Sequence, residues 1–174
     1  MGSRGFNVAV FGAGHVGSAV VRSLSTLDCE IRWIDSRQDF FGDTPENVHT
    51  IEHDRPAAEV DNMSAGSCYL VMTHDHGLDF DICKRILKRG DAAYCGLIGS
   101  VPKRRRFERH LLEEGIGQEA FDQLVCPIGI EGIRGKKPAE IAISATAQVL
   151  RAFEEFRRKP SFEYPDDQPM TNTQ

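Results

Sequence analysis

The residues best suited to chemistry in this sequence form a glycine-rich turn near its start. Gly12, Gly14 and Gly17 follow the apolar run Phe6–Phe11 and precede a segment whose apolar residues recur at helical spacing. In such a turn the first glycine permits a tight bend, the second lets a pyrophosphate approach the backbone, and the third lets the helix pack close to the sheet. Free amides at the helix start favour an anion. The pattern predicts a nucleotide-like ligand site, although a tight turn without a ligand has the same glycines. The candidate binding residues here are Gly12, Gly14, His15, Val16 and Gly17.

An acidic residue closes the second apolar run at the position where a ribose would be recognised. Asp35 ends the run Glu30–Asp35 and lies 21 residues after Gly14. A carboxylate there favours an unphosphorylated ribose, as in NAD, whereas Arg37 could serve a 2′-phosphate, as in NADP. The choice between the two cofactors stays open from the sequence. The candidate residues of this segment are Asp35, Ser36 and Arg37.

A basic helix start provides a second candidate anion site. Ser100 has N-cap character, and the run Lys103–Arg106 crowds the positive end of the helix that follows. Each misplaced charge costs about 0.3–1 kcal/mol against the helix dipole, and an anionic ligand or an acidic partner surface would relieve that cost. The alternative is a solvated basic face, with Phe107 and Leu111 packed inward. The candidate residues are Gly99, Ser100, Lys103 and Arg104.

Two further turns carry reactive residue types. Thr73 and His74 follow a buried run and are expected to face the ligand crevice, with Asp79 as the N-cap of the next helix. No metal site is expected, because His74 and His76 would point to opposite faces of an extended segment. No catalytic triad or pair of acid–base carboxylates is recognisable.

The second turn lies before the last helix. Cys126 precedes a proline in this turn and is expected to be a structural thiol. Lys136 and Lys137 are expected to form a second basic rim.

The elements that must position these residues alternate between strand and helix. We expect strands at 6–11, 30–35, 48–51, 68–73 and 93–98, with helices after the glycine turn and at 79–89, 102–114 and 138–158. This alternation predicts a Rossmann-like α/β domain of three layers with a mostly parallel sheet. Residues 1–159 are expected to form that domain, and 160–174 a disordered tail rich in proline and polar residues.

Composition narrows the possible partners. The chain has 174 residues and a net charge of −5, which disfavours nucleic acid and anionic membrane surfaces. No apolar run approaches the ~18 residues that a membrane span needs. Five scattered cysteines indicate reduced thiols in a cytoplasmic protein. A homodimer is a hypothesis based on Phe153 and Phe156, which are expected to be exposed on the last helix.

Several of these motifs, taken in order, resemble one known family. They are Val10–Gly17, Trp33–Arg37, Val71–His76, Leu78–Asp79, Gly96–Ser100, Lys103–Arg104, Arg106–Phe107, Cys126–Gly129, Pro138 and Glu140–Ala142. Together they resemble the xanthine dehydrogenase accessory protein family, XdhC with its CoxI-type relatives, over about residues 6–156. The similarity is to the Rossmann-type C-terminal domain. Members usually carry a further N-terminal domain, so we expect a stand-alone variant, a truncated form or half of a split system.

The resemblance implies a maturation factor rather than a catalyst. Its expected ligand is molybdenum cofactor, a phosphorylated pterin also called molybdopterin. Its expected partners are a molybdenum hydroxylase client of the xanthine dehydrogenase type and a cysteine desulfurase that supplies sulfur. Two alternatives fit the glycine turn as well, an NAD(P)-dependent oxidoreductase and a dinucleotide-sensing regulatory module. The fold alone does not separate these three functions.

Overall fold

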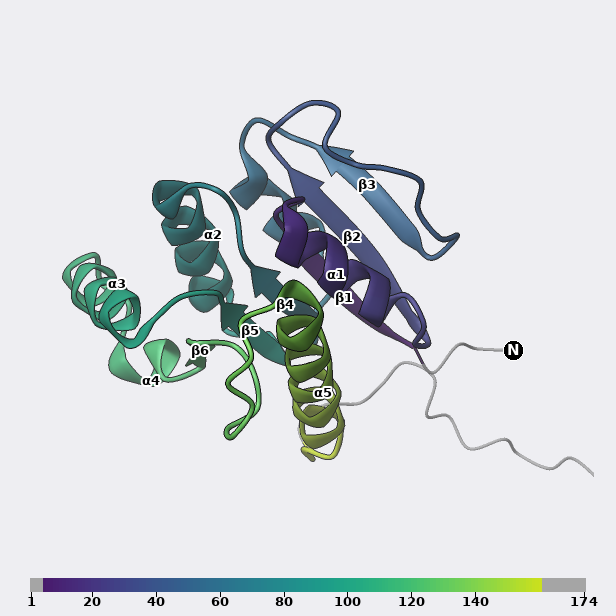
Figure 1. Ribbon diagram of the computed structural model, residues 1–174. Helices are drawn as coiled ribbons and strands as arrows, with labels where there is room; N and C mark the ends of the chain where they lie inside the picture. The colour runs from purple at the N-terminus through teal and green to yellow at the C-terminus, as the bar shows by residue number, and fades with distance from the viewer. Residues whose placement is uncertain (1–4, 161–174) are drawn as a thin grey trace, which may run out of the picture.

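A computed structural model describes residues 5–160 of the chain (Figure 1). The strands are β1 (Phe6–Phe11), β2 (Cys29–Asp35), β3 (Val48–Glu52), β4 (Cys68–Val71), β5 (Tyr94–Leu97) and β6 (Leu124–Val125). The helices are α1 (His15–Leu24), the 3₁₀ helix η1 (Pro56–Asn62), α2 (His76–Arg89), α3 (Val101–Glu113), α4 (Gln118–Phe121) and α5 (Pro138–Arg157). The tail predicted for 160–174 lies outside the described residues, apart from Pro160.

The six strands form one parallel sheet in the order β3-β2-β1-β4-β5-β6. Helices α1 and α5 pack together on one face, and α2 with η1 covers the other (Figure 1). Strand β1 serves both layers, because successive side chains of a strand point to opposite faces. Val8 and Val10 join the core under α1 and α5, whereas Ala9 and Phe11 join the core under α2. The predicted Rossmann-like α/β fold is confirmed.

The carboxyl ends of β1, β4 and β5 bring three turns side by side. Backbone hydrogen bonds continue past the strand ends, from Met72 N to Phe11 O and from Ile98 N to Val71 O, each 2.9 Å long. Strands β1 and β4 are neighbours, although the chain visits β2 and β3 between them. Successive strands are added toward one edge of the sheet from β1 to β3 and toward the other edge from β4 to β6, so the strand order reverses between β1 and β4. Open α/β sheets bind ligands in the crevice at such a switch point.

Two predictions about single residues are wrong. Helix α2 begins at His76, and Asp75 is its N-cap, with a carboxylate that accepts from Leu78 N at 2.9 Å. Asp79 lies one turn inside the helix and is fully buried.

Phe153 was predicted to be exposed on the last helix. It is 3% exposed because it stacks on Phe6, with ring centroids 4.8 Å apart, so it offers no surface for a homodimer.

The sequence patterns did not predict two short elements, but they did predict the state of the cysteines. Helix α4 and strand β6 are four and two residues long, too short for a detectable period. All five cysteines are free and buried, as expected of reduced core thiols. Within residues 5–160, no helix combines the length and the apolar character needed to cross a membrane.

Candidate functional site

The glycine turn after β1 is held tightly on its inner side. Gly12 has φ 120°, a conformation that L side chains rarely adopt, and a Cβ there would clash with the carbonyl oxygen of Met72. Its own carbonyl accepts a 2.8 Å hydrogen bond from Trp33 Nε1. A Cβ on Gly17 would in turn clash with the Gly12 carbonyl. Gly12 therefore permits the tight bend, and Gly17 permits the close approach of the helix, which are the roles that the spacing predicts for the first and third positions.

Gly14 differs because it faces open space. It is the N-cap residue of α1, and a Cβ built on it would meet no atom within 4 Å. The first amides of a helix lack intrahelical partners. Among the described residues, no side chain accepts a hydrogen bond from the amides of residues 14–17. By contrast, Asp75, Ser100 and Glu140 each accept from a backbone amide at the start of α2, α3 and α5. The start of α1 is thus left with free donors.

A shallow groove of about 450 Å³ adjoins these donors between α1 and the start of α5. It contains three residues that are or can become cationic, His15, Arg22 and Lys137, and no carboxylate. Its lining residues are His15, Ser18, Ala19, Arg22, Lys137, Pro138 and Ala139. The predicted second basic rim is present at Lys137. Arg22 was missed by sequence reasoning, although it lies two helical turns after His15 on the same helix face.

The β2-end carboxylate is close to the glycine turn but turned inward. The Asp35 side chain is 1% exposed and accepts four hydrogen bonds. Ala13 N donates to Oδ2 at 2.7 Å, and Arg37 donates from its backbone N, Nε and one terminal nitrogen at 2.8–3.0 Å. Burial alone would raise the pKa of Asp35, but the hydrogen bonds from Arg37 and Ala13 outweigh it and lower that pKa. Ser36 is half-buried in the same turn.

The basic start of α3 is occupied by the protein's own acceptors. Lys103 is 7% exposed, and its ammonium donates to Asp79 Oδ2 at 3.0 Å and to the Ile98 carbonyl at 2.8 Å. Gly99 makes room for this, since a Cβ there would press on the Lys103 side chain. Arg104 donates to the Leu124 carbonyl at 2.7 Å and lies over the Phe121 ring. Both cations thus have internal partners.

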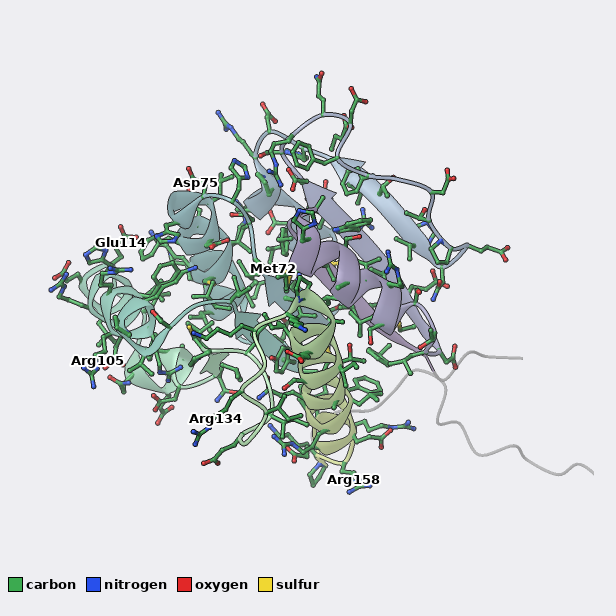
Figure 2. The ribbon with its side chains drawn as sticks, viewed as in Figure 1. Met72, Asp75, Arg105, Glu114, Arg134 and Arg158 are labelled. Atoms are coloured by element: carbon green, nitrogen blue, oxygen red, sulfur yellow. The ribbon has the colours of Figure 1, made fainter. Side chains whose placement is uncertain are left out.

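The outer part of the same helix is solvated. Arg105 and Arg106 are exposed, and Figure 2 shows Arg105 on the outer side of α3, away from the sheet. Phe107 and Leu111 are buried in the core under α2. The sequence left a choice between an anion site and a solvated basic face, and these positions have the geometry of the solvated face.

The turn after β4 is built around Asp79. Thr73 donates to Asp79 Oδ1 from its backbone N at 2.9 Å and from its hydroxyl at 2.7 Å. His74 is exposed at the same edge, and Figure 2 places Met72 of this turn beside the start of α1. Asp79 therefore links this turn to Lys103 of the β5–α3 turn. Among residues 5–160, no cluster of His, Cys, Asp or Glu has the geometry to hold a metal ion.

Cys126 has the character of a structural thiol. It is buried, and that burial raises its pKa despite the nearby charges of Lys103 and Arg104. A protonated thiol is a weak nucleophile, because the thiolate is the reactive form.

Comparison with known protein families identifies a domain of the same Rossmann type. Residues 8–149 match the family described as the XdhC Rossmann domain. The chain belongs to this family. Its resemblance to XdhC proteins, expected from the motifs, is confirmed.

Two proteins similar to this chain are much longer than it is. A xanthine dehydrogenase from Bacillus halodurans is 26% identical in its crystal structure, with a TM-score of 0.70 over 91% of this chain and 45% of its own. The uncharacterized protein YqeB of Escherichia coli K12 is 26% identical over 146 residues, which are 83% of this chain and 27% of YqeB. The chain therefore spans less than half the length of either relative.

Proposed function

We propose that this chain acts in the maturation of a molybdenum hydroxylase of the xanthine dehydrogenase type, and that it binds the phosphate of molybdenum cofactor at the glycine turn. The single observation that carries the proposal is the uncapped start of α1 in a member of the XdhC Rossmann domain family. A client hydroxylase and a cysteine desulfurase are the partners that this role requires.

The residues present fit a phosphate better than they fit any other part of the cofactor. Free amides of residues 14–17 and the positive end of the α1 dipole favour an anion. The open space over Gly14 lets a phosphate approach the backbone. Lys137 and Arg22 line the adjoining groove and add attraction without a competing carboxylate. The free amides of residues 14–17 would hold the phosphate, and Arg22 and Lys137 would attract its negative charge.

This chain's role in that process is to hold and shield rather than to react. Molybdenum cofactor supplies the redox metal and the ligand that is sulfurated. All five cysteines are buried, so none presents a thiol that could carry sulfur to it. Sulfur would therefore come directly from the desulfurase partner while this domain binds the phosphate end.

The oxidoreductase alternative fits the geometry less well. Nicotinamide dinucleotides are recognised in Rossmann folds through a carboxylate at the end of the second strand. Here that carboxylate, Asp35, already accepts four hydrogen bonds from the protein. A dinucleotide-sensing module would meet the same obstacle.

Ligand retention in a molybdenum-replete host tests the proposal. The chain is purified under mild conditions, and released pterin is oxidised to its fluorescent form and quantified beside nicotinamide nucleotides. We expect bound molybdopterin and an increase in the activity of a co-incubated apo-hydroxylase. Bound nicotinamide with no pterin, together with turnover of a small substrate, would replace the proposal with the oxidoreductase function.

A matched pair of charge reversals localises the ligand. Lys137→Glu places a carboxylate in the groove, whereas Lys88→Glu makes the same change on the exposed side of α2. We expect Lys137→Glu to lose most of the retained pterin and Lys88→Glu to keep it. Equal retention by both variants would show that the groove is not the binding site.

A further inference from the structure

The β2-end carboxylate has no capacity left for a ligand. A carboxylate offers about four lone-pair positions. In Asp35, Oδ1 accepts from Arg37 N and Nε, and Oδ2 accepts from Ala13 N and a terminal nitrogen of Arg37. A ribose diol would need two of these positions. It could bind only if the Arg37 guanidinium, which fills two of them, moved away.

Arg37 is itself held in place on both sides. Its guanidinium carbon lies 3.6 Å from the centre of the Phe40 ring, and its Nε and one terminal nitrogen form the paired contact with Asp35. The Arg37 side chain is 28% exposed, so it forms the solvent-facing cover over a carboxylate that is otherwise buried. Paired, bidentate contacts of this kind are the strongest that arginine makes with carboxylates.

We propose that Arg37 determines the ligand class of the glycine turn: it closes Asp35 to ribose hydroxyls, so the site rejects NAD⁺ and accepts phosphate-bearing ligands without a ribose diol at this position. This inference rests on the proposed function only in placing the ligand phosphate at the glycine turn. Arg37 acts through Asp35 and does not itself contact the ligand.

Titration calorimetry with NAD⁺ on the purified chain tests the inference. We expect wild type to bind NAD⁺ more weakly than about 1 mM. Arg37→Ala keeps the backbone amide but removes the two guanidinium hydrogen bonds, so it frees two of the four positions on Asp35. A hydrogen bond to a charged group is worth enough to raise NAD⁺ affinity about 10- to 100-fold. Adding Asp35→Asn to Arg37→Ala should remove the gain, because the freed acceptor is then no longer a carboxylate.

Control variants separate the blocking of Asp35 by Arg37 from a general change in charge. Arg32→Ala removes the neighbouring arginine of β2, which pairs with Glu59 instead, and should gain no NAD⁺ affinity. Thermal unfolding checks that each variant folds, and Arg37→Gln replaces Arg37→Ala if the latter does not.

Three results would overturn the inference. The first is wild-type binding of NAD⁺ that Arg37→Ala leaves unchanged. The second is a folded Arg37→Ala or Arg37→Gln variant with no gain. The third is tight wild-type binding of NADP⁺ that is lost in Arg37→Ala, which would make Arg37 a phosphate ligand rather than a cover. Pterin retention is measured separately, so a gain of NAD⁺ binding without any retained pterin would sustain this inference and defeat the proposed function.

Discussion

Two turns of this protein occupy equivalent places in the fold but differ in whether their hydrogen-bond donors are already used. The β1–α1 turn and the β5–α3 turn each follow a buried strand at the carboxyl edge and each begin a long helix. The β5–α3 turn is rich in positive charge, but Ser100 caps its helix and Lys103 and Arg104 bind internal acceptors. The β1–α1 turn has little charge of its own, yet its first amides are unclaimed. Unused donors, rather than the density of positive residues, mark the candidate anion site.

The largest effect should come from removing the internal cation of the basic turn. Lys103→Met leaves Asp79 buried without its charge partner, which typically costs about 3–5 kcal/mol of unfolding free energy. Denaturant unfolding measures the loss. Arg109→Met, an exposed change on the same helix, is the control and should stay within about 0.5 kcal/mol. A Lys103→Met protein as stable as that control would contradict the claim that Lys103 stabilises the buried Asp79 carboxylate.

Within the glycine turn, packing and ligand positions should respond differently to the same change. Gly17→Ala drives a Cβ into the Gly12 carbonyl, and overpacking of this kind costs about 1–3 kcal/mol. Gly14→Ala meets open space and should cost less than about 1 kcal/mol. Unfolding free energies of the two variants test the difference. If Gly14→Ala were the more damaging, Gly14 would be a packing residue too.

The pH dependence of stability should reveal the hydrogen bonds that the Asp35 carboxylate accepts from Arg37 and Ala13. Because its pKa is lowered on folding, Asp35 stabilises the protein above its unfolded pKa of about 3.9, and this contribution is lost as pH falls through the lowered folded value. Asp35→Asn should therefore be less stable than wild type near neutral pH, with the difference shrinking below about pH 4. Denaturation at a series of pH values measures this. A difference that is constant across the series would contradict it.

The smallest effect should come from the solvated arginines of α3. Arg105 and Arg106 are exposed, so replacing both by glutamine should change the unfolding free energy by no more than about 0.5 kcal/mol each. It should also leave pterin retention intact. Loss of pterin in this double variant would return the basic turn to consideration as an anion site.

Local patterns predicted the parts of this fold that local physics determines. The strand–glycine–helix pattern predicted the roles of Gly12 and Gly17, because each depends on backbone within the same unit. Asp75 was missed as a cap because Asp79 also has N-cap character and lies only four residues later. The partner of Lys103 was not predictable, since Asp79 is 24 residues away and meets it only across the sheet edge.

The same limit applies to charge at the candidate site. Asp35 was predicted to face a ribose, because its position after β2 matches that role in dinucleotide-binding folds. Its saturation by Arg37 depends on a side chain two residues away that folds back over it. Sequence placed both residues at the site but left their relation open. Which donors and acceptors are already used is a property of the folded chain.

The most direct test of the account is the molybdopterin content of Gly14→Asp. An aspartate at an N-cap accepts from helix amides and is favoured by the dipole, so this variant should fold with equal or higher stability. Its carboxylate would occupy the free donors and repel a phosphate. We predict a folded protein that retains almost no pterin when purified beside wild type from the same host. Undiminished pterin in folded Gly14→Asp would contradict the claim that the start of α1 binds the ligand.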